Sequence, residues 1–414
     1  MTMKSLLLGA AAGIAAIGAA QAADLPMTKG EAVEYVKVCS TFGPGFFYIP
    51  GSDTCLKIGG EVRAYYRLFG GDNFSRNDNR SAFNAEGRIW FDARTQTDYG
   101  LLRSYFQINA QSHPISAQGR DNVTSSNTFS IDKAFIQFGG LTAGYAHSFF
   151  GFYDNDYGDT IYAPYYNEAN TVNLLAYTAQ FGGGFSATLS IEDGRDHRVN
   201  GTVITGTAAA QGGQQVPDAV GQLRYDADWG AVAVQAAGHQ FRTAESVGAH
   251  SNKYGWAAGG SLAIKIPAID SGHFVVEGQY ADGALDYLGA GNTWIAQSDY
   301  FVSHGGAGPL DGGKGWSITA ELGGNITPVL NANLVGSYID TKYDGIFSSG
   351  SDGQIKEFTV AGNLTYTIVK GLKVSAEVAY THGTVDGATI VSGPFADQDK
   401  YSTWQSGIRI LRSF

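Results

Sequence analysis

The sequence is poor in several residue types that usually define a protein class. Its 414 residues include two cysteines, three methionines and ten prolines, and only 16% of them are charged. Beyond the N-terminal stretch, no apolar run approaches the roughly 18 residues that suggest a membrane-spanning helix. The formal charge is −11 at pH 7 and basic residues do not cluster, so binding to nucleic acid is not expected.

The motifs of common enzymes are also missing. No H-E-x-x-H or G-x-S-x-G motif occurs, and we find no glycine-rich phosphate loop. The two cysteines, Cys39 and Cys55, are better interpreted as one structural disulfide than as metal ligands, because two further ligands at suitable spacing are lacking. We therefore expect no enzyme, no cofactor and no metal site.

Glycine and aromatic residues are abundant instead. The chain has 57 glycines, 23 tyrosines and 23 phenylalanines, although its hydrophobic content is an ordinary 43%. Many segments alternate between apolar and polar residues with period two, as Glu357–Ile368 and Leu372–Thr381 do. This alternation is typical of strands in a sheet whose two faces meet different surroundings.

Sixteen such segments are predicted as strands. They are 55–69, 83–98, 101–111, 128–138, 140–148, 171–181, 184–193, 218–228, 230–242, 253–266, 272–284, 315–326, 329–341, 355–368, 371–383 and 401–414. Seven short turns alternate with eight long loops between them. Outer-membrane barrels have an even strand number, tight periplasmic turns and longer outer loops. The pattern therefore predicts an all-β fold, a 16-stranded antiparallel transmembrane β-barrel.

The beginning of the chain predicts export. Lys4 precedes a short apolar stretch, Leu6–Ala20, and Ala20-Gln21-Ala22 provides an A-x-A cleavage site. A membrane anchor is less favoured, because this stretch is short and rich in alanine and glycine. The predicted organisation is a signal peptide at 1–22, an N-terminal segment with the disulfide at 23–54, and the barrel at 55–414.

Soluble β folds alternate in the same way but fit the connections of this chain less well. A sandwich needs no systematic division between short and long connections, and a propeller has a repeat of about 40–50 residues, which we do not find. An exported protein with these strands has to close into a barrel in order to satisfy its backbone groups in lipid.

The third long connection, 149–170, has an unusual composition. Its sequence FFGFYDNDYGDTIYAPYYNEAN holds eight aromatic residues, and no lysine or arginine occurs between Lys133 and Arg195. We expect this loop to fold into the lumen, where aromatic rings pack on the wall and carboxylates meet passing solute. The carboxylates that would form the acidic side of a constriction are Asp154, Asp156, Asp159 and Glu168.

Arginines on the first three strands share one face. Placing an arginine at mid-depth against lipid costs about 2–4 kcal/mol, so this face should point into the lumen. The predicted basic wall consists of Arg63, Arg67, Arg88, Arg94 and Arg103. The alternative is that these arginines only neutralise Glu61, Glu86 and Asp92 beside them.

The stretch Glu34–Arg63, EYVKVCSTFGPGFFYIPGSDTCLKIGGEVR, resembles the N-terminal signature of the porins of rhizobial and related alphaproteobacteria. The resemblance implies a general porin of the Gram-negative outer membrane, a passive diffusion channel for small hydrophilic solutes and ions, selected by size and charge. It also implies a homotrimer, with the third long loop as the constriction. The expected surroundings are outer-membrane lipid and lipopolysaccharide.

Two other functions remain open from sequence. The aromatic residues of 149–170 would also suit a substrate-specific sugar channel, although anchoring of the loop is their simpler role. A closed structural or adhesive barrel is the other alternative, with an exposed and flexible loop 285–314 as its contact surface.

Overall fold

The computed structural model describes residues 37–414 apart from 73, 75, 77, 114–126, 153–159, 162–164, 168–169, 201–210, 245–251, 296, 307, 348 and 388–397. The predicted signal peptide and the first part of the N-terminal segment therefore lie outside the described residues. Within the described part, no helix has the length and hydropathy needed to cross a membrane.

Sixteen long antiparallel strands of the described chain form one sheet. The first eight are β2 (Cys55–Gly71), β3 (Ser81–Thr97), β4 (Gly100–Ser112), β5 (Thr128–Phe138), β6 (Leu141–His147), β7 (Thr171–Gly182), β8 (Phe185–Glu192) and β9 (Asp218–Ala227). The others are β10 (Gly230–Arg242), β11 (Asn252–Lys265), β12 (Asp270–Asp282), β15 (Lys314–Thr327), β16 (Leu330–Tyr343), β17 (Gly353–Val369), β18 (Leu372–Asp386) and β19 (Lys400–Ser413). The prediction of sixteen strands is confirmed, with bounds within a few residues.

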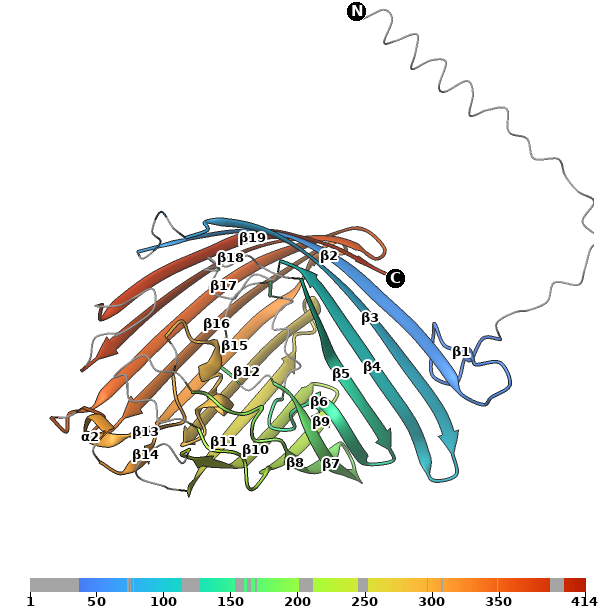
Figure 1. Ribbon diagram of the computed structural model, residues 1–414. Coiled ribbons are helices and arrows are strands. Elements are labelled where there is room, and N and C mark those ends of the chain that lie inside the picture. Colours follow the sequence, from blue (N-terminus) through green and yellow to red (C-terminus); the bar gives the residue numbers. More distant parts are fainter. Residues whose placement is uncertain are drawn as a thin grey trace, which may run out of the picture.

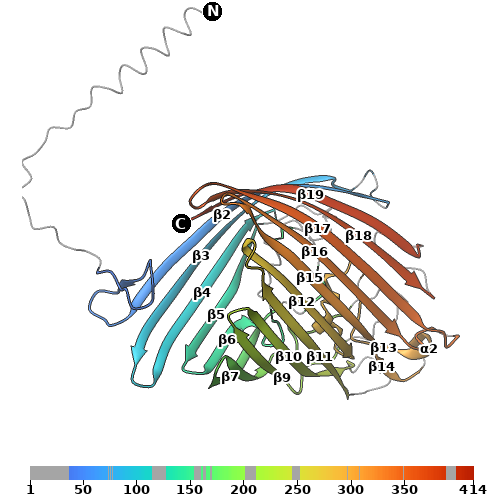
Figure 2. The same cartoon turned by 180° about the vertical axis from the view of Figure 1, so that it is seen from behind.

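The sheet closes on itself. Each strand pairs with its neighbour in sequence, except that β12 pairs with β15, and β19 returns to pair with β2. The backbone of Phe414 extends this last ladder by exchanging two hydrogen bonds with Gly60, 2.9 and 3.2 Å long. Figures 1 and 2 show the resulting barrel from two sides, with its tilted strands.

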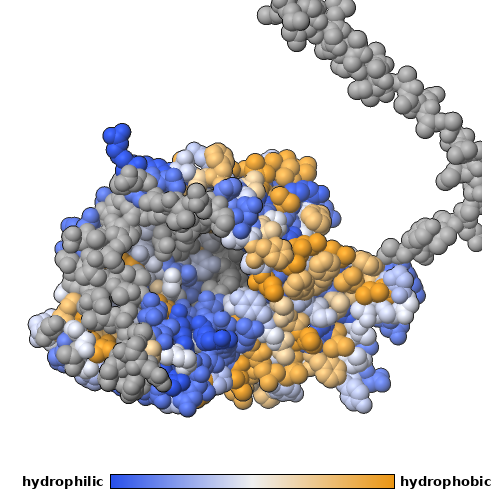
Figure 3. Space-filling model, viewed as in Figure 1, coloured by the Kyte–Doolittle hydropathy of each residue, from blue (hydrophilic) through white to orange (hydrophobic). Residues whose placement is uncertain are grey.

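The two faces of the barrel have opposite polarity. Outward-facing side chains are apolar and exposed, as at Leu189, which is 75% exposed, and Leu223, which is 60% exposed. Inward-facing side chains such as Thr319 and Glu277 are polar and buried. Figure 3 shows hydrophobic residues over the part of the barrel that carries β3 to β5, and hydrophilic residues beside a central hollow. This inverted arrangement is the one expected of a barrel in lipid.

The connection between β12 and β15 corrects one expectation. The prediction that 285–314 is exposed is wrong for its first part, because Leu285, Leu288 and Ile295 are fully buried, whereas Gly305, Gly306 and Pro309 are exposed. This connection contains the short elements η2 (Leu285–Leu288), η3 (Ala290–Asn292), β13 (Tyr300–Val302), α2 (Ser303–Gly306) and β14 (Leu310–Gly312). Its glycines suggested mobility, but they permit tight turns such as the one at Gly289, whose φ is 72°.

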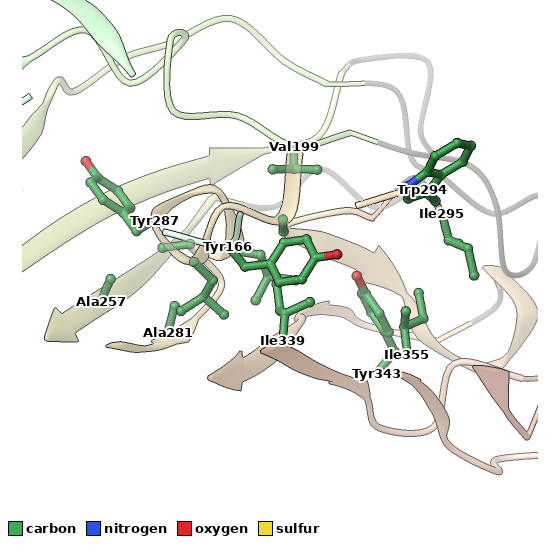
Figure 4. Close-up of a cluster of buried hydrophobic side chains, with 14 of the residues drawn as sticks. Tyr166, Val199, Ala257, Ala281, Tyr287, Trp294, Ile295, Ile339, Tyr343 and Ile355 are labelled. Atoms are coloured by element: carbon green, nitrogen blue, oxygen red, sulfur yellow. The ribbon is translucent and has the colours of Figure 1, made fainter. Parts of the chain in front are cut away.

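A hydrophobic cluster joins this connection to the rest of the barrel. Tyr166 from the segment 149–170 lies in it with Tyr287, Ile295 and Tyr343, and all four are almost completely buried. Figure 4 shows these side chains meeting from strands and from connecting segments. The two connections are therefore packed against each other and against the barrel.

The described part of the N-terminal segment is held to the first strand. Cys39 and Cys55 form a disulfide bond. The short strand β1 (Phe47–Tyr48) pairs with Leu56 and Cys55 at the beginning of β2. This segment thus lies at the end of the barrel where β2 begins.

Candidate pore and its lining

The five arginines of the predicted basic wall occur on β2, β3 and β4. Strand alternation turns them away from outward residues such as Val62, Ile89 and Leu102, all of which are exposed. Arg63, Arg88, Arg94 and Arg103 are partly exposed, and Arg67 is buried. All five arginines of the predicted wall lie on the inward face: Arg63, Arg67, Arg88, Arg94 and Arg103.

Carboxylates on the same strands pair with these arginines. Arg63 Nη2 lies 2.5 Å from Glu61, and Arg88 contacts both Glu86 and Glu61. Across the next strand pair, Asp92 accepts hydrogen bonds from two arginines, Arg94 and Arg103, at 2.7–3.0 Å. The neutralising pairs considered from sequence are therefore all present.

These pairs do not neutralise the whole wall. Among the described residues of β2, β3, β4 and β19, seven inward-facing cations accompany three inward-facing carboxylates. The cations are Lys57, Arg63, Arg67, Arg88, Arg94, Arg103 and Arg409, and the carboxylates are Glu61, Glu86 and Asp92. The positive sign of this surface follows from the difference.

Arg409 was missed by sequence reasoning. It lies on β19, pairs with Tyr65 of β2 in the sheet, and is only 2% exposed. Its outward-facing neighbours Ile408 and Ile410 are exposed. The same alternation that assigned the other arginines could have placed it on the inward face from the sequence of β19 alone, whereas its position beside β2 follows from the closure of the sheet.

The four carboxylates predicted for the acidic side, Asp154, Asp156, Asp159 and Glu168, lie outside the described residues. Their placement stays a prediction. The described residues of the same segment are 149–152, 160–161, 165–167 and 170, and their contacts with the barrel are well defined.

These described residues bind the inward face of the barrel. Near the start of the segment, Gln222 on β9 donates hydrogen bonds to the carbonyl oxygens of Phe149 and Gly151, 3.0 and 3.2 Å away. Further along, the Ile161 N–H donates to Glu377 on β18, and the Asn167 amide donates to Glu277 on β12, both at 2.7 Å. The segment thus contacts strands on several sides of the barrel.

Glu357 on β17 is contacted by both long connecting segments, 149–170 and 285–314. It accepts hydrogen bonds from the hydroxyls of Tyr166 and Tyr401, and from the backbone N–H of Trp294 at 3.0 Å. Burial, followed by the nearby Glu357 carboxylate, raises the pKa of the Tyr166 hydroxyl well above its usual value, so this hydroxyl remains a donor. Both connecting segments are therefore fixed to one carboxylate.

The carboxylates Glu277, Glu321, Glu357 and Glu377 were not chosen as functional candidates from sequence. Each lies on the polar face of an alternating strand and is nearly completely buried. An isolated buried carboxylate would be costly, so each needs hydrogen-bond donors. For Glu277, Glu357 and Glu377 donors come from distant loops, whereas His273 on the neighbouring strand β12 contacts Glu321, so strand parity was the one signal available from sequence.

Comparisons with a family model and with known protein sequences agree on the family to which the chain is similar. The model of the family described as "Porin subfamily" matches residues 24–404. Over 240 residues the chain is 37% identical to the porin Omp2b of Brucella suis, and 36% identical to the porin Omp2b of Brucella melitensis. Both alignments cover 56% of this chain and 65% of the relative, so the chain spans less than two thirds of the length of the curated relatives it matches.

Solved structures with a similar fold are also membrane barrels. The outer membrane channel DcaP of Acinetobacter baumannii matches with a TM-score of 0.67 at 15% identity, covering 89% of this chain and 99% of that one. OmpT of Vibrio cholerae, in its trimer form, matches with a TM-score of 0.50 at 12% identity, covering 88% of this chain and 100% of that one. At these identities the likeness concerns the fold alone.

Proposed function

This chain belongs to the porin subfamily, and we propose that it forms a water-filled channel for passive diffusion of small hydrophilic solutes and ions. It is a protein of the Gram-negative outer membrane. The observation that carries the proposal is the closed barrel with a polar inward face, on which seven cations accompany three carboxylates along β2, β3, β4 and β19 of the described chain. Family membership also supports transport rather than an enzymatic function.

We further propose that 149–170 narrows this channel. Support comes from the hydrogen bonds of its described residues to Gln222, Glu277 and Glu377 on the inward face. Asp154, Asp156, Asp159 and Glu168 would then supply negative charge opposite the arginines. A channel selects by the diameter and charge of its narrowest part, so such a pair of surfaces would favour small polar solutes.

A homotrimer in outer-membrane lipid and lipopolysaccharide is part of the proposal. The structural neighbour OmpT is described in a trimer form, which supports this assembly by analogy of fold. Stepwise closure of reconstituted channels in groups of three is the expected sign of a trimer.

Recording from purified protein in planar bilayers tests the function. We expect stable open-channel steps, and their absence would favour a closed structural or adhesive barrel. In a salt gradient, replacing Asp154, Asp156 and Asp159 together by Asn should shift the zero-current potential toward anions. An unchanged potential would show that these carboxylates are not at the constriction.

The sugar-channel alternative needs a separate measurement. Liposome swelling with sugars of increasing size should give rates that fall smoothly with size for a general channel. Saturable uptake of a single sugar would instead support a substrate-specific channel.

A further inference from the structure

A cavity of about 600 Å³ opens on the inward face of the barrel. Its walls come from β4 to β9 and from the start of the segment 149–170. Thr178, Gln180 and Ser186 line it close to the short turn between β7 and β8. The cavity therefore lies on the short-turn side of the barrel, which is the periplasmic side in outer-membrane barrels.

Three cations from three different strands line this cavity. Arg103 belongs to β4, Lys133 to β5 and Arg224 to β9. Among the described lining residues, Asp226 is the one carboxylate, and it lies 2.9 Å from Arg224. Among the described lining residues, cations thus outnumber carboxylates three to one.

Both guanidinium groups are held in fixed orientations. Arg103 donates to Asp92 through two nitrogens at 2.9 and 3.0 Å, and to Gln137 at 3.0 Å. Arg224 donates to Asp226 and to the carbonyl oxygen of Phe152, the latter at 3.3 Å. Groups positioned in advance lose little entropy when a ligand binds.

Aromatic rings supply a flat surface beside these charges. The rings of Tyr105 and Phe135 stack with centroids 5.3 Å apart, and the Arg103 guanidinium lies 5.2 and 5.4 Å from them. Phe149 lines the cavity from the segment 149–170. These rings are partly buried, so their remaining surface faces the cavity.

We propose that this cavity is a binding subsite for small organic anions that carry a carboxylate on a planar apolar body. The carboxylate meets Lys133 and Arg224, and the planar body packs on Tyr105, Phe135 or Phe149. The described lining is mostly polar, and the aromatic rings give it a smaller apolar part, so the cavity offers both kinds of contact to such an anion in one concave site. The inference rests on the channel function proposed above and adds a preferred solute class to it.

Benzoate and benzamide provide a matched pair of probes, because they share a ring and differ in charge. In single-channel recordings, benzoate should reduce the current with a saturable concentration dependence. Benzamide should act at concentrations at least about tenfold higher, since it lacks the charge that the cations bind.

The double variant Lys133→Gln/Arg224→Gln should weaken the apparent affinity for benzoate about tenfold. Lys356→Gln is the matched control, because Lys356 binds the exposed Asp386 on the neighbouring strand instead of lining the cavity. It should leave the benzoate affinity unchanged. Lys133→Gln alone keeps the test decisive if the double variant does not fold, and should weaken the affinity about threefold.

Two results would overturn the subsite while leaving the channel intact: open channels on which benzoate and benzamide act equally, or block by benzoate that survives the lysine and arginine substitutions. A lack of open-channel steps in the unmodified protein would overturn the channel function itself.

Discussion

Charged groups on two parts of the inward face differ in how far their side chains are exposed. On β2 to β4, the side chains of Arg63, Arg88, Arg94 and Arg103 remain 11–25% exposed. On β12 to β18, the carboxylates Glu277, Glu321, Glu357 and Glu377 are at most 2% exposed. Both sets follow the same strand alternation, so parity alone does not decide which charges meet water.

Coverage by the connecting segments makes the difference. The arginines have partners on their own or the adjacent strand, as Arg94 on β3 and Arg103 on β4 share Asp92. Glu277 and Glu377 instead accept hydrogen bonds from the segment 149–170. One part of the face thus presents charge to the lumen, whereas the other uses its charge to fix the segments that lie across it.

The largest effect is expected from Glu357→Ala. This substitution removes the buried acceptor that Tyr166, Tyr401 and the Trp294 N–H share, although the Tyr166 hydroxyl keeps its contact with Thr359 at 3.0 Å. A loss of about 3 kcal/mol in stability is expected, together with a larger and noisier conductance. Urea unfolding followed by tryptophan fluorescence, together with bilayer recording, measures both.

Arg94→Gln is the matched variant on the other part of the face. Asp92 would keep both hydrogen bonds from Arg103, so the loss in stability should be below about 1 kcal/mol. Equal losses in Arg94→Gln and Glu357→Ala would contradict the distinction between the two parts.

An intermediate effect is expected from the triple variant Arg63→Gln/Arg88→Gln/Arg103→Gln. Charges a few ångströms from a passing ion change its energy by about 1 kcal/mol in a watery surrounding. The ratio of cation to anion permeability should therefore rise roughly fivefold, as measured by zero-current potentials. Arg412→Gln, on the outward face, serves as control and should leave this ratio unaltered.

The smallest effect is expected in the pH dependence of folding stability. It extends the comparison to Asp299, a carboxylate outside the barrel strands. Burial, followed by repulsion from Asp286, raises the pKa of Asp299 to about 7, although His239 opposes this shift. The folded carboxyl keeps its proton to a higher pH than the unfolded one, whose pKa is 3.8. Its contribution to stability is thus complete below about pH 4 and is lost as the pH rises through about 7.

Thermal unfolding at pH 5 and pH 8 measures this effect. The wild-type protein should lose more stability between these values than Asp299→Asn, whose side chain cannot ionise. Identical pH dependence in the two proteins would show that Asp299 is already ionised at pH 5.

Strand alternation was sufficient to predict the barrel, whereas the role of its arginines as a pore wall stays a prediction. It was not sufficient for 285–314, which lacks a regular period and is ordered by contacts such as Trp294 with Glu357. The anchoring role of Glu357 was equally inaccessible, since its partners Tyr166 and Trp294 are separated from it by 191 and 63 residues. Hydrogen bonds between residues so far apart leave no local pattern in the sequence from which they could be predicted.

The pairing of β1 with β2 covers part of the strand edge at the seam, where the last strand β19 pairs with the first strand β2. The ladder between β19 and β2 covers Glu61–Gly71 and is extended to Gly60 by Phe414, whereas Leu56 and Cys55 pair with β1. An open strand edge exposes backbone donors and acceptors that invite pairing with another chain. Because the disulfide between Cys39 and Cys55 ties β1 to this edge, it shields the start of the seam from an intruding strand. The disulfide thus holds β1 in place along a strand edge that the ladder with β19 does not reach.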